Sequence, residues 1–336
     1  MERELVARAG VRFATIKAGA MHGVGAARAL RGAFRTAHGV RLALRILDDF
    51  RPDVVLLTGG FVGVPVSLAA KIRGLPSVVY LPDIEPGQAF KVMARLAAKV
   101  ATTTNASAAF LGARDARKMV VTGYPVREVF QSVSRQTART HFGLPLDARV
   151  LLVFGGSKGA QSINRAVTAG ITKLLKEAYV IHVSGANDFS EVSAARNDLP
   201  LDLQARYLVF RYLHEDMALA MAGADLTVCR AGASALGELT FVGLPAILVP
   251  YPYAWRYQKV NAAYLSERGA AVTLRDEDMA DTVRGLVVQA TTLLANTAQL
   301  SAMRRAALAA GQRDGAQRIA ALVMDTTKAF KAGQHG

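Results

Sequence analysis

Residues 154–160 (FGGSKGA) form a glycine-rich segment whose composition suits the binding of a phosphate group. The segment follows an apolar run at Val150–Phe154 that predicts a strand, and it precedes a helical pattern. A strand, a glycine turn and a helix N-terminus together offer free backbone N–H groups and the positive end of a helix dipole to an anion. The segment matches neither G-x-x-x-x-G-K-[ST] nor G-x-G-x-x-G. A purely structural turn between strand and helix fits the pattern equally well.

A second segment repeats this arrangement. Leu226–Cys229 predicts a strand, residues 230–234 (RAGAS) predict a loop, and residues 235–242 predict a helix that Ser234 is placed to cap. Glu238 then lies about one turn into the helix, where a carboxylate can accept hydrogen bonds from both hydroxyls of a ribose. An acid that only complements the helix dipole would have the same position. This segment alone leaves both interpretations open.

A third segment adds aromatic and amide side chains. Residues 250–261 (PYPYAWRYQKVN) follow a predicted strand at Ala246–Val249, so they lie at the carboxyl end of a parallel sheet, where such sheets bind ligands. Flat aromatic faces can stack on a sugar, and the amides of Gln258 and Asn261 can bond its hydroxyls. Clustered aromatic residues also pack against one another without a ligand. Three such loops at one sheet edge favour a binding site.

Short β-rich runs alternate with helical patterns along the chain, as parallel sheets covered on both faces require. We therefore predict an α/β fold with two doubly wound parallel sheets, divided near residues 123–126 and the polar stretch 131–140. The predicted strands are Arg12–Lys17, Val54–Leu57, Ser77–Leu81, Lys99–Thr103 and Met119–Val121, followed by Val150–Phe154, Tyr179–Val183, Leu208–Phe210, Leu226–Cys229, Ala246–Val249 and Ala271–Leu274.

Composition limits the remaining classes of protein. The chain has 336 residues, 51% hydrophobic and 20% charged, which suits two globular domains. Its single cysteine, Cys229, excludes a disulfide scaffold, and its six histidines show no metal-ligand spacing. The formal net charge of +15 favours anionic partners. No recognisable nucleic-acid module is present, so we expect no nucleic-acid partner. The acidic first residues predict no secretory signal, and we expect a cytoplasmic protein with peripheral membrane contact.

Residues 28–50 have the spacing of an amphipathic helix that we expect to be broken or bent near Gly32 and Gly39. The basic stripe predicts a surface that settles on anionic phospholipid, with apolar residues beside it inserting. A solvated cationic face on a helix packed against the sheet is the alternative. The residues expected at the membrane are Arg28, Arg31, Phe34, Arg35, Arg41 and Arg45.

Taken together, the three segments resemble signatures of the MurG family of peptidoglycan glycosyltransferases. The resemblance covers nearly the whole chain and includes residues 51–53, 58–62 and 123–127 of its front half. The motifs in the back half are G-G-S-x-G-A followed by N at 155–164, R-A-G-A-S-x-x-x-E at 230–238 followed by G-L-P-A-I-L-V-P at 243–250, and Q-x-x-N-A at 258–262.

The resemblance implies a GT-B architecture, in which two Rossmann-like domains face each other across a cleft. It implies an acceptor and membrane domain at residues 1–131, a UDP-sugar domain at 132–316, and a helix at 317–336 that returns to the first domain. The implied reaction moves GlcNAc from UDP-GlcNAc to undecaprenyl-diphospho-N-acetylmuramyl-pentapeptide with inversion. It passes through an oxocarbenium-like state and uses no cofactor or metal.

By the same resemblance, a group of residues would bind the donor. Ser157 and its loop would hold the diphosphate, and Glu238 would hold the ribose. Gln258 and Asn261 would read the GlcNAc hydroxyls. The complete expected set also includes Arg127 near the diphosphate and His214 near the uracil, and it comprises Arg127, Gly156, Ser157, Gly159, His214, Ala233, Ser234, Glu238, Gln258 and Asn261.

The chain departs from the family pattern in three places. Its start resembles an internal position of the family, so the family's first strand and a glycine loop carrying a base-type histidine are expected to be missing. Residues 80–83 (YLPD) replace a His-Glu-Gln-Asn segment, which makes Asp83 the candidate base, although an acid capping a turn fits as well. Two neighbouring family glutamines become Tyr257 and Gln258. The acceptor chemistry and the identity of the sugar are therefore less sharply specified.

The expected partners are UDP-GlcNAc, a lipid-linked acceptor and an anionic membrane surface at the cytoplasmic face of the cell membrane. Two other functions stay open. One is transfer of the same sugar to a different lipid acceptor. The other is a non-catalytic UDP-GlcNAc-binding subunit, suggested by the missing first loop. A UDP-GlcNAc epimerase shares the architecture, but its characteristic acid pair is not evident in this sequence.

Overall fold

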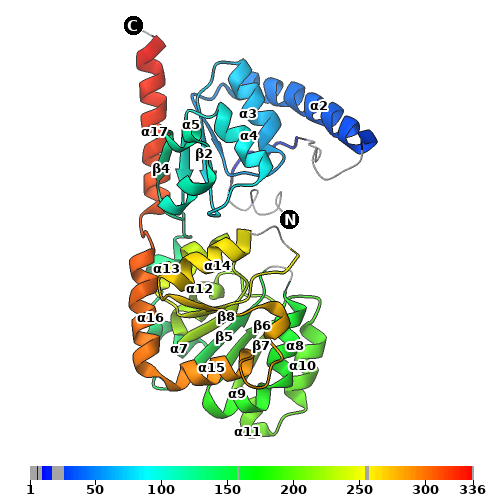
Figure 1. The fold of residues 1–336 in the computed structure, drawn as a ribbon, viewed down its shortest axis with the longest axis vertical. Helices are drawn as coiled ribbons and strands as arrows, with labels where there is room; N and C mark the ends of the chain where they lie inside the picture. Colours follow the sequence, from blue (N-terminus) through cyan, green and yellow to red (C-terminus); the bar gives the residue numbers. More distant parts are fainter. Residues whose placement is uncertain (1–5, 7–9, 17–25, 157–158, 254–256, 335–336) are drawn as a thin grey trace. The chain divides into compact units, whose positions relative to one another are not determined.

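The structure is a computed structural model that describes residue 6 and residues 10–16, 26–156, 159–253 and 257–334, without the side chains of 26–35 and 334 (Figure 1). The chain forms two compact units. Unit 1 comprises residues 1–82, 86–122 and 317–336, and unit 2 comprises residues 83–85 and 123–316. Each unit has its own parallel sheet. The functional division predicted at residues 131 and 316 stays a prediction.

Unit 1 contains a four-stranded parallel sheet whose strand order, β1-β2-β3-β4, follows the order along the chain. Because each crossover steps in the same direction, right-handed connections place α3 and α4 on one face. β2 and β4 have the predicted bounds, and β1 and β3 are each one residue shorter than predicted. The elements are α2 (Ala26–Phe50), β1 (Val55–Leu57), α3 (Gly63–Ile72), β2 (Ser77–Leu81), α4 (Gln88–Leu96), β3 (Lys99–Thr102), η1 (Asn105–Phe110), α5 (Ala113–Ala116), β4 (Met119–Val121) and α17 (Gly315–Gln334) from Gln317 onward.

The two faces of the unit 1 sheet have separate apolar cores. Val79 and Leu81 of β2 pack with α3 and α4, whereas Val78 and Tyr80 pack with α17. This alternation is that of a strand covered on both faces, and every residue of β2 is buried. Figure 1 shows α17 in red beside the sheet, on the side away from α3 and α4.

Helix α2 packs on α3 through its apolar stripe, with Ala43 and Leu47 buried in that contact. The helix runs unbroken past Gly32 and Gly39, so a break at these glycines is ruled out. A glycine inside a helix costs about 1 kcal/mol relative to alanine. Packing of the apolar stripe offsets that cost, because most helical stability in proteins comes from such tertiary contacts.

The predicted strand at Arg12–Lys17 is also wrong: residues 12–16 have no regular secondary structure, and Lys17 lies outside the described residues. Val11 and Phe13 are exposed, and Ile16 is partly buried at the edge of the α2–α3 contact. The segment has the composition of a strand. A strand also needs a ladder partner and a face to bury, however, and within residues 12–16 only Ile16 joins the core.

Unit 2 contains a six-stranded parallel sheet in the order β10-β9-β8-β5-β6-β7. After β5 the chain adds β6 and β7 on one side, then returns to add β8, β9 and β10 on the other. β5, β6 and β8 have the predicted bounds, and the other three differ by one residue. The strands are β5 (Val150–Phe154), β6 (Tyr179–Val183), β7 (Tyr207–Phe210), β8 (Leu226–Cys229), β9 (Ala246–Leu248) and β10 (Ala271–Thr273).

A large apolar core lies on one face of the unit 2 sheet, where α8, α9, α15 and α16 bury side chains against strands such as β5 and β8. Figure 1 shows α12, α13 and α14 on the other side of this sheet. The helices are α6 (Val129–Ser132), α7 (Arg135–His141), α8 (Gln161–Ala169), α9 (Ile171–Glu177), α10 (Phe189–Asn197), α11 (Leu201–Gln204), α12 (Asp216–Gly223), η2 (Ala235–Leu239), α13 (Thr240–Val242), α14 (Tyr257–Glu267), η3 (Asp276–Asp278), α15 (Leu286–Ala295) and α16 (Thr297–Ala310).

Among the helices that the structure describes, none is long and apolar enough to cross a membrane. The uncharged stretch at residues 54–70 forms β1, a glycine turn and most of α3, as the sequence predicts.

Candidate functional site

The strand order of unit 2 reverses between β5 and β8, and the segments that follow these two strands leave the sheet side by side. Phe154, the last residue of β5, is paired with Cys229, the last residue of β8, and with Val183 at the end of β6. In open parallel sheets, ligands bind at the carboxyl ends of the strands at such a reversal. The two glycine-containing segments singled out in the sequence therefore flank one switch point.

The glycine segment after β5 closes tightly on its neighbours. Gly156 and Gly159 have φ of +90° and +79°, and the Gly159 N–H donates to the Gly156 carbonyl at 3.0 Å. A Cβ on Gly159 would lie 2.4 Å from the Ser184 carbonyl oxygen. The positive φ and this close approach both require glycine. Ser157, expected at the diphosphate, and Lys158 lie outside the described residues.

Helix α8 begins directly after this glycine turn. Ala160 stands at its N-cap position and has no side-chain oxygen to accept from the first N–H groups of the helix. Those groups therefore remain for water or an anion. The phosphate site predicted from the sequence stays a prediction, and Gly156 and Gly159 shape the backbone that leads to α8.

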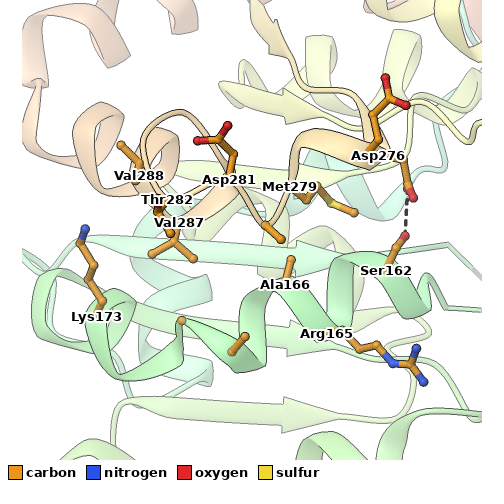
Figure 2. A pocket seen from close by; sticks show the side chains of 14 residues that line it. Ser162, Arg165, Ala166, Lys173, Asp276, Met279, Asp281, Thr282, Val287 and Val288 are labelled. Atoms are coloured by element: carbon orange, nitrogen blue, oxygen red, sulfur yellow. Dashed lines mark hydrogen bonds between the residues drawn. The ribbon is translucent and has the colours of Figure 1, made fainter.

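Arg230, at the end of β8, connects the segments around the switch point. Its guanidinium donates to Ser162 Oγ at 2.7 Å, to the Val249 carbonyl at 3.2 Å and to the Asp276 carboxylate. Figure 2 shows the Ser162–Asp276 hydrogen bond that completes this cluster. The sequence analysis did not single out Arg230. An arginine placed directly after a buried strand is the signal that could have identified it.

Glu238 lies on η2, a single turn of π-helix between Ser234 and α13. Such turns are rare in proteins overall, but those that occur are often found at functional sites. The prediction that Ser234 caps this helix is wrong, because Ser234 makes no side-chain cap hydrogen bond. It has helical φ and ψ of −60° and −28°, whereas a capping serine needs an extended backbone. Ser234 and the preceding Ala233 are both partly buried.

Arg127, Glu238 and His214 come together in unit 2 although they are far apart in the sequence. One Arg127 nitrogen lies 3.7 Å from Glu238 Oε1, and another donates to the His214 carbonyl at 3.2 Å. The Glu238 side chain is only 16% exposed. Burial raises the pKa of Glu238, and the Arg127 charge partly opposes this shift.

Tyr124 packs directly on η2 behind Glu238. A Cβ on Gly237 would lie 2.2 Å from Cγ of the Tyr124 ring and 2.5 Å from its Cβ. Burial raises the pKa of Tyr124, and the nearby carboxylates of Glu238 and Asp83 raise it further. The absence of a side chain at Gly237 therefore lets the Tyr124 ring support the turn that carries Glu238.

Asn261 is fully buried, and its amide is used inside the chain. Its nitrogen donates to Asp83 Oδ1 at 2.8 Å and to the Ala231 carbonyl at 3.1 Å, and its oxygen accepts from the Ile84 N–H at 3.2 Å. The structure thus gives Asn261 a positioning role between residues 83–84 and the loop after β8. Its expected contact with sugar hydroxyls stays a prediction.

Asp83 is held near this edge by the Asn261 amide. Burial raises the pKa of Asp83, and the hydrogen bond from Asn261 opposes the shift. Gln258, on the first turn of α14, accepts a hydrogen bond from the Tyr251 N–H at 2.8 Å. Tyr251 and Tyr253 stand edge to face with ring centroids 5.7 Å apart, and both are exposed. The two tyrosines are therefore exposed and the Gln258 side chain is half-buried, whereas the Asn261 amide is buried.

A separate pocket of about 770 Å³ lies between α8, α9 and residues 276–288. Figure 2 shows Arg165 and Lys173 on its helical side and Asp276 and Asp281 on the facing loop. None of the residues expected to bind the donor lines it. In the part of the chain that the structure describes, no cluster of three His, Cys, Asp or Glu residues forms a candidate metal site.

Two of the six residues expected at a membrane can be placed. Arg41 and Arg45 are exposed on α2, one turn apart. Arg28, Arg31, Phe34 and Arg35 lie on the same helix, but their side chains are outside the described residues.

Comparison with known proteins defines the class to which this fold and site belong. Residues 150–319 match the glycosyltransferase family 28 C-terminal domain, and residues 1–102 match the glycosyltransferase family 28 N-terminal domain. The chain belongs to glycosyltransferase family 28, an enzyme family, and its two parallel-sheet units are the Rossmann-like domains that the sequence predicts.

Its relatives include proteins named UDP-N-acetylglucosamine–N-acetylmuramyl-(pentapeptide) pyrophosphoryl-undecaprenol N-acetylglucosamine transferase. That from Roseiflexus sp. (strain RS-1) is 40% identical, with 96% of this chain aligned to 81% of the relative. That from Desulforudis audaxviator is 37% identical, with 93% and 84% covered. Among solved structures, Acinetobacter baumannii MurG matches with a TM-score of 0.74 at 25% identity, covering 97% of this chain and 88% of that one.

We expect Gly237→Ala to displace η2. Rotation of the Tyr124 ring cannot relieve the contact, because the Tyr124 Cβ itself is too close to the new methyl group. Overpacking of this kind typically lowers the free energy of unfolding by about 1–3 kcal/mol, which urea titration measures. Gly112→Ala is the matched control, since nothing lies within 4 Å of a Cβ at Gly112. Equal stability of the two variants would show that η2 accommodates the methyl group.

Proposed function

We propose that this protein transfers GlcNAc from UDP-GlcNAc to N-acetylmuramyl-pentapeptide pyrophosphoryl-undecaprenol, and so acts in peptidoglycan synthesis. The observation that carries this proposal is the switch point of unit 2. The glycine turn before α8 and the loop leading to Glu238 leave adjacent strands at one level there. The named activity of relatives that share up to 40% identity over nearly the whole chain supports the same reaction.

The donor diphosphate binds at the start of α8, where Gly156, Ser157 and Gly159 let the backbone N–H groups approach it. Glu238 accepts hydrogen bonds from the ribose hydroxyls. Arg127 lies 3.7 Å from Glu238 and is half exposed, so its guanidinium can reach the diphosphate. The uracil contacts the chain near His214. Ala233 and Ser234 line the approach to η2, and Gln258, with Asn261, lies on the sugar side.

The reaction is a single displacement that inverts the anomeric carbon. Negative charge develops on the departing UDP, and the N-terminal dipole of α8 together with Arg127 stabilises that charge. A base removes the proton from the acceptor hydroxyl as it attacks.

Asp83 is the base in this proposal. Its burial raises the pKa of the carboxyl group, which makes the carboxylate a stronger proton acceptor than an exposed aspartate. Asn261 fixes one carboxylate oxygen at 2.8 Å and leaves the other available for the hydroxyl. The acceptor is the lipid-linked muramyl-pentapeptide that the relatives' names specify.

The lipid part of that acceptor requires contact with the cytoplasmic face of the membrane, and we assign this contact to the basic face of α2. Arg41 and Arg45 are exposed one turn apart, a spacing that presents both charges to one surface. Arg28, Arg31, Phe34 and Arg35 extend the same amphipathic pattern toward the start of the helix. The result is peripheral attachment through anionic lipid.

Glu238→Gln should raise the Kd for UDP-GlcNAc by roughly 10- to 100-fold, which corresponds to about 1–3 kcal/mol for a lost charged hydrogen bond. Isothermal titration calorimetry measures the change. The matched control is Glu191→Gln, because Glu191 is exposed on α10 and makes only a 3.9 Å contact with Arg165. Unaltered affinity in Glu238→Gln would remove the ribose contact from the proposal.

The affinity of the same site for UDP-GlcNAc should depend on pH. The pKa of Glu238 is raised, so on acidification this group takes up a proton at a higher pH than an ordinary glutamate does. The ribose contact needs the unprotonated acceptor, and affinity for UDP-GlcNAc should therefore fall as the pH drops through that raised value. Glu238→Gln should lack this limb of the profile.

Asp83→Asn should lower kcat by roughly 10²- to 10⁴-fold, the usual contribution of a general base, and leave the Kd for UDP-GlcNAc within about twofold. The oxygen of the introduced amide can still accept the Asn261 hydrogen bond, so the local fold is preserved. The control is Asp202→Asn on exposed α11. Because the pKa of Asp83 is raised, kcat/KM of the unchanged enzyme should fall on acidification above the ordinary aspartate range. Retention of more than half of kcat in Asp83→Asn would contradict the assignment.

Membrane contact is tested by changing Arg41 and Arg45 together to Gln. Each basic residue near an anionic surface contributes about 1 kcal/mol, so the partition constant should drop roughly 30-fold. Flotation with phosphatidylglycerol vesicles measures it. The double variant Arg114→Gln/Arg117→Gln removes the same charge from α5 and the residue that follows it, also in unit 1, and should bind like the unchanged protein. Equal losses in the two double variants would indicate that only net charge matters.

A further inference from the structure

Four polar side chains form a buried hydrogen-bond relay inside unit 2. The Tyr207 hydroxyl lies 2.7 Å from His182 Nδ1, and His182 Nε2 lies 2.9 Å from Asn164 Oδ1. Asn164 Nδ2 lies 2.7 Å from Asp188 Oδ2 and 2.9 Å from the Ser184 carbonyl oxygen. All four side chains are buried, and His182 is fully enclosed.

The relay has one consistent direction. A carboxylate and a carbonyl only accept, so Asn164 turns its NH₂ group toward Asp188 and Ser184 and its oxygen toward His182. His182 must then donate from Nε2 and accept at Nδ1 from the Tyr207 hydroxyl. Burial lowers the pKa of His182 to about 3 and raises that of Tyr207. The relay therefore keeps this single proton arrangement throughout the physiological pH range.

The relay ends at the glycine turn. Asn164 lies one turn into α8, the helix that starts after residues 155–160, and Ser184 follows the last residue of β6. The Ser184 carbonyl that accepts from Asn164 is also the atom that excludes a Cβ at Gly159, at 2.4 Å. One backbone oxygen thus links the relay, the start of α8 and the glycine turn.

We propose that this relay is a positioning device for the donor diphosphate, with Asn164 and His182 as positioning residues that fix α8 and the glycine turn against the segment after β6. The inference rests on the proposed function in that the start of α8 holds the diphosphate. A buried polar group is costly unless it is paired, and a fully paired set permits one arrangement only. Apolar contacts have no preferred direction, whereas these hydrogen bonds add a directional constraint on α8.

The relay predicts an effect confined to the phosphate part of the ligand. A displacement of the glycine turn on the order of 1 Å should weaken binding of the diphosphate about tenfold or more. Binding of uridine, which has no phosphate, should not change. A residue that merely stabilises the fold would weaken the two ligands equally.

Asn164→Asp provides the sharpest test, because it places a second carboxylate against Asp188. The introduced carboxylate group cannot donate as the amide does, so Asp188 and the Ser184 carbonyl lose the donor that Asn164 supplies, and two acceptors face each other. The other ionisable groups around this position are His182 from β6 and Tyr207 from β7. Arg165 and Glu191 pair at the exposed surface between α8 and α10, and α15 contributes no charged residue.

Calorimetry at pH 8 with UDP-GlcNAc and with uridine should give the following results, each relative to the unchanged protein. Asn164→Asp and Asn164→Ala both lose the donor to the Ser184 carbonyl, so each binds UDP-GlcNAc about tenfold or more weakly. The affinity of each for uridine is unchanged. The exchange variant Asn164→Asp/Asp188→Asn removes the juxtaposed carboxylates but not the loss of the donor to Ser184, so it recovers only part of the affinity for UDP-GlcNAc.

Two results would overturn the relay. One is normal UDP-GlcNAc affinity of Asn164→Asp at pH 8, and the other is an equal loss for uridine and UDP-GlcNAc. Sugar transfer by the unchanged protein is measured in parallel with the lipid-linked acceptor. Its absence would contradict the proposed function alone, because the relay is judged from binding.

Discussion

The direction and register of the parallel strands in unit 2 are the constraint on which the rest of the site depends. All six strands end at one edge, and β5, β6 and β8 end at the same level, with Phe154 paired to both Val183 and Cys229. The chain can therefore place a glycine turn, the segment at Ser184 and the Arg230 loop side by side, although they are widely separated in sequence. Without the strand reversal between β5 and β8, these segments would not share one switch point.

That arrangement places polar groups in the interior. These groups form hydrogen bonds with one another in small separate sets. Arg230 is bonded to Ser162, Asp276 and a backbone carbonyl. Asn261 uses its whole amide on residues 83–84 and 231. Each set joins segments that follow different strands, so each fixes the position of one loop relative to another. Because an unpaired buried group costs about 1–3 kcal/mol, these hydrogen-bonded sets oppose displacement of the loops that they join.

The secondary structure could be predicted from the sequence wherever a single physical signal decides it. Strands such as β2 and β5 are buried on both faces and read as unbroken apolar runs, and their predicted ends agree with the structure. Residues 12–16 (RFATI) also contain strand-forming residues, but a strand needs a partner as well, and that requirement is not visible in local sequence. The glycine turn and Glu238 could be located from motifs. The roles of Arg230, Tyr124 and Asn261 could not, because their partners lie on distant segments.

Two buried carboxylates of unit 2, those of Glu238 and Asp83, differ in the groups that surround them. The pKa values of Glu238 and Asp83 are both raised by loss of water, but their neighbours differ. Glu238 faces the Arg127 cation at 3.7 Å, which favours its charged form as a fixed acceptor for hydroxyl groups. Asp83 faces a neutral amide at 2.8 Å, which orients the carboxylate without supplying a positive charge. A proton acceptor has to change its charge during the reaction, whereas a binding group does not. The cation beside one acid and the amide beside the other are therefore consistent with the two proposed roles, binding for Glu238 and proton transfer for Asp83.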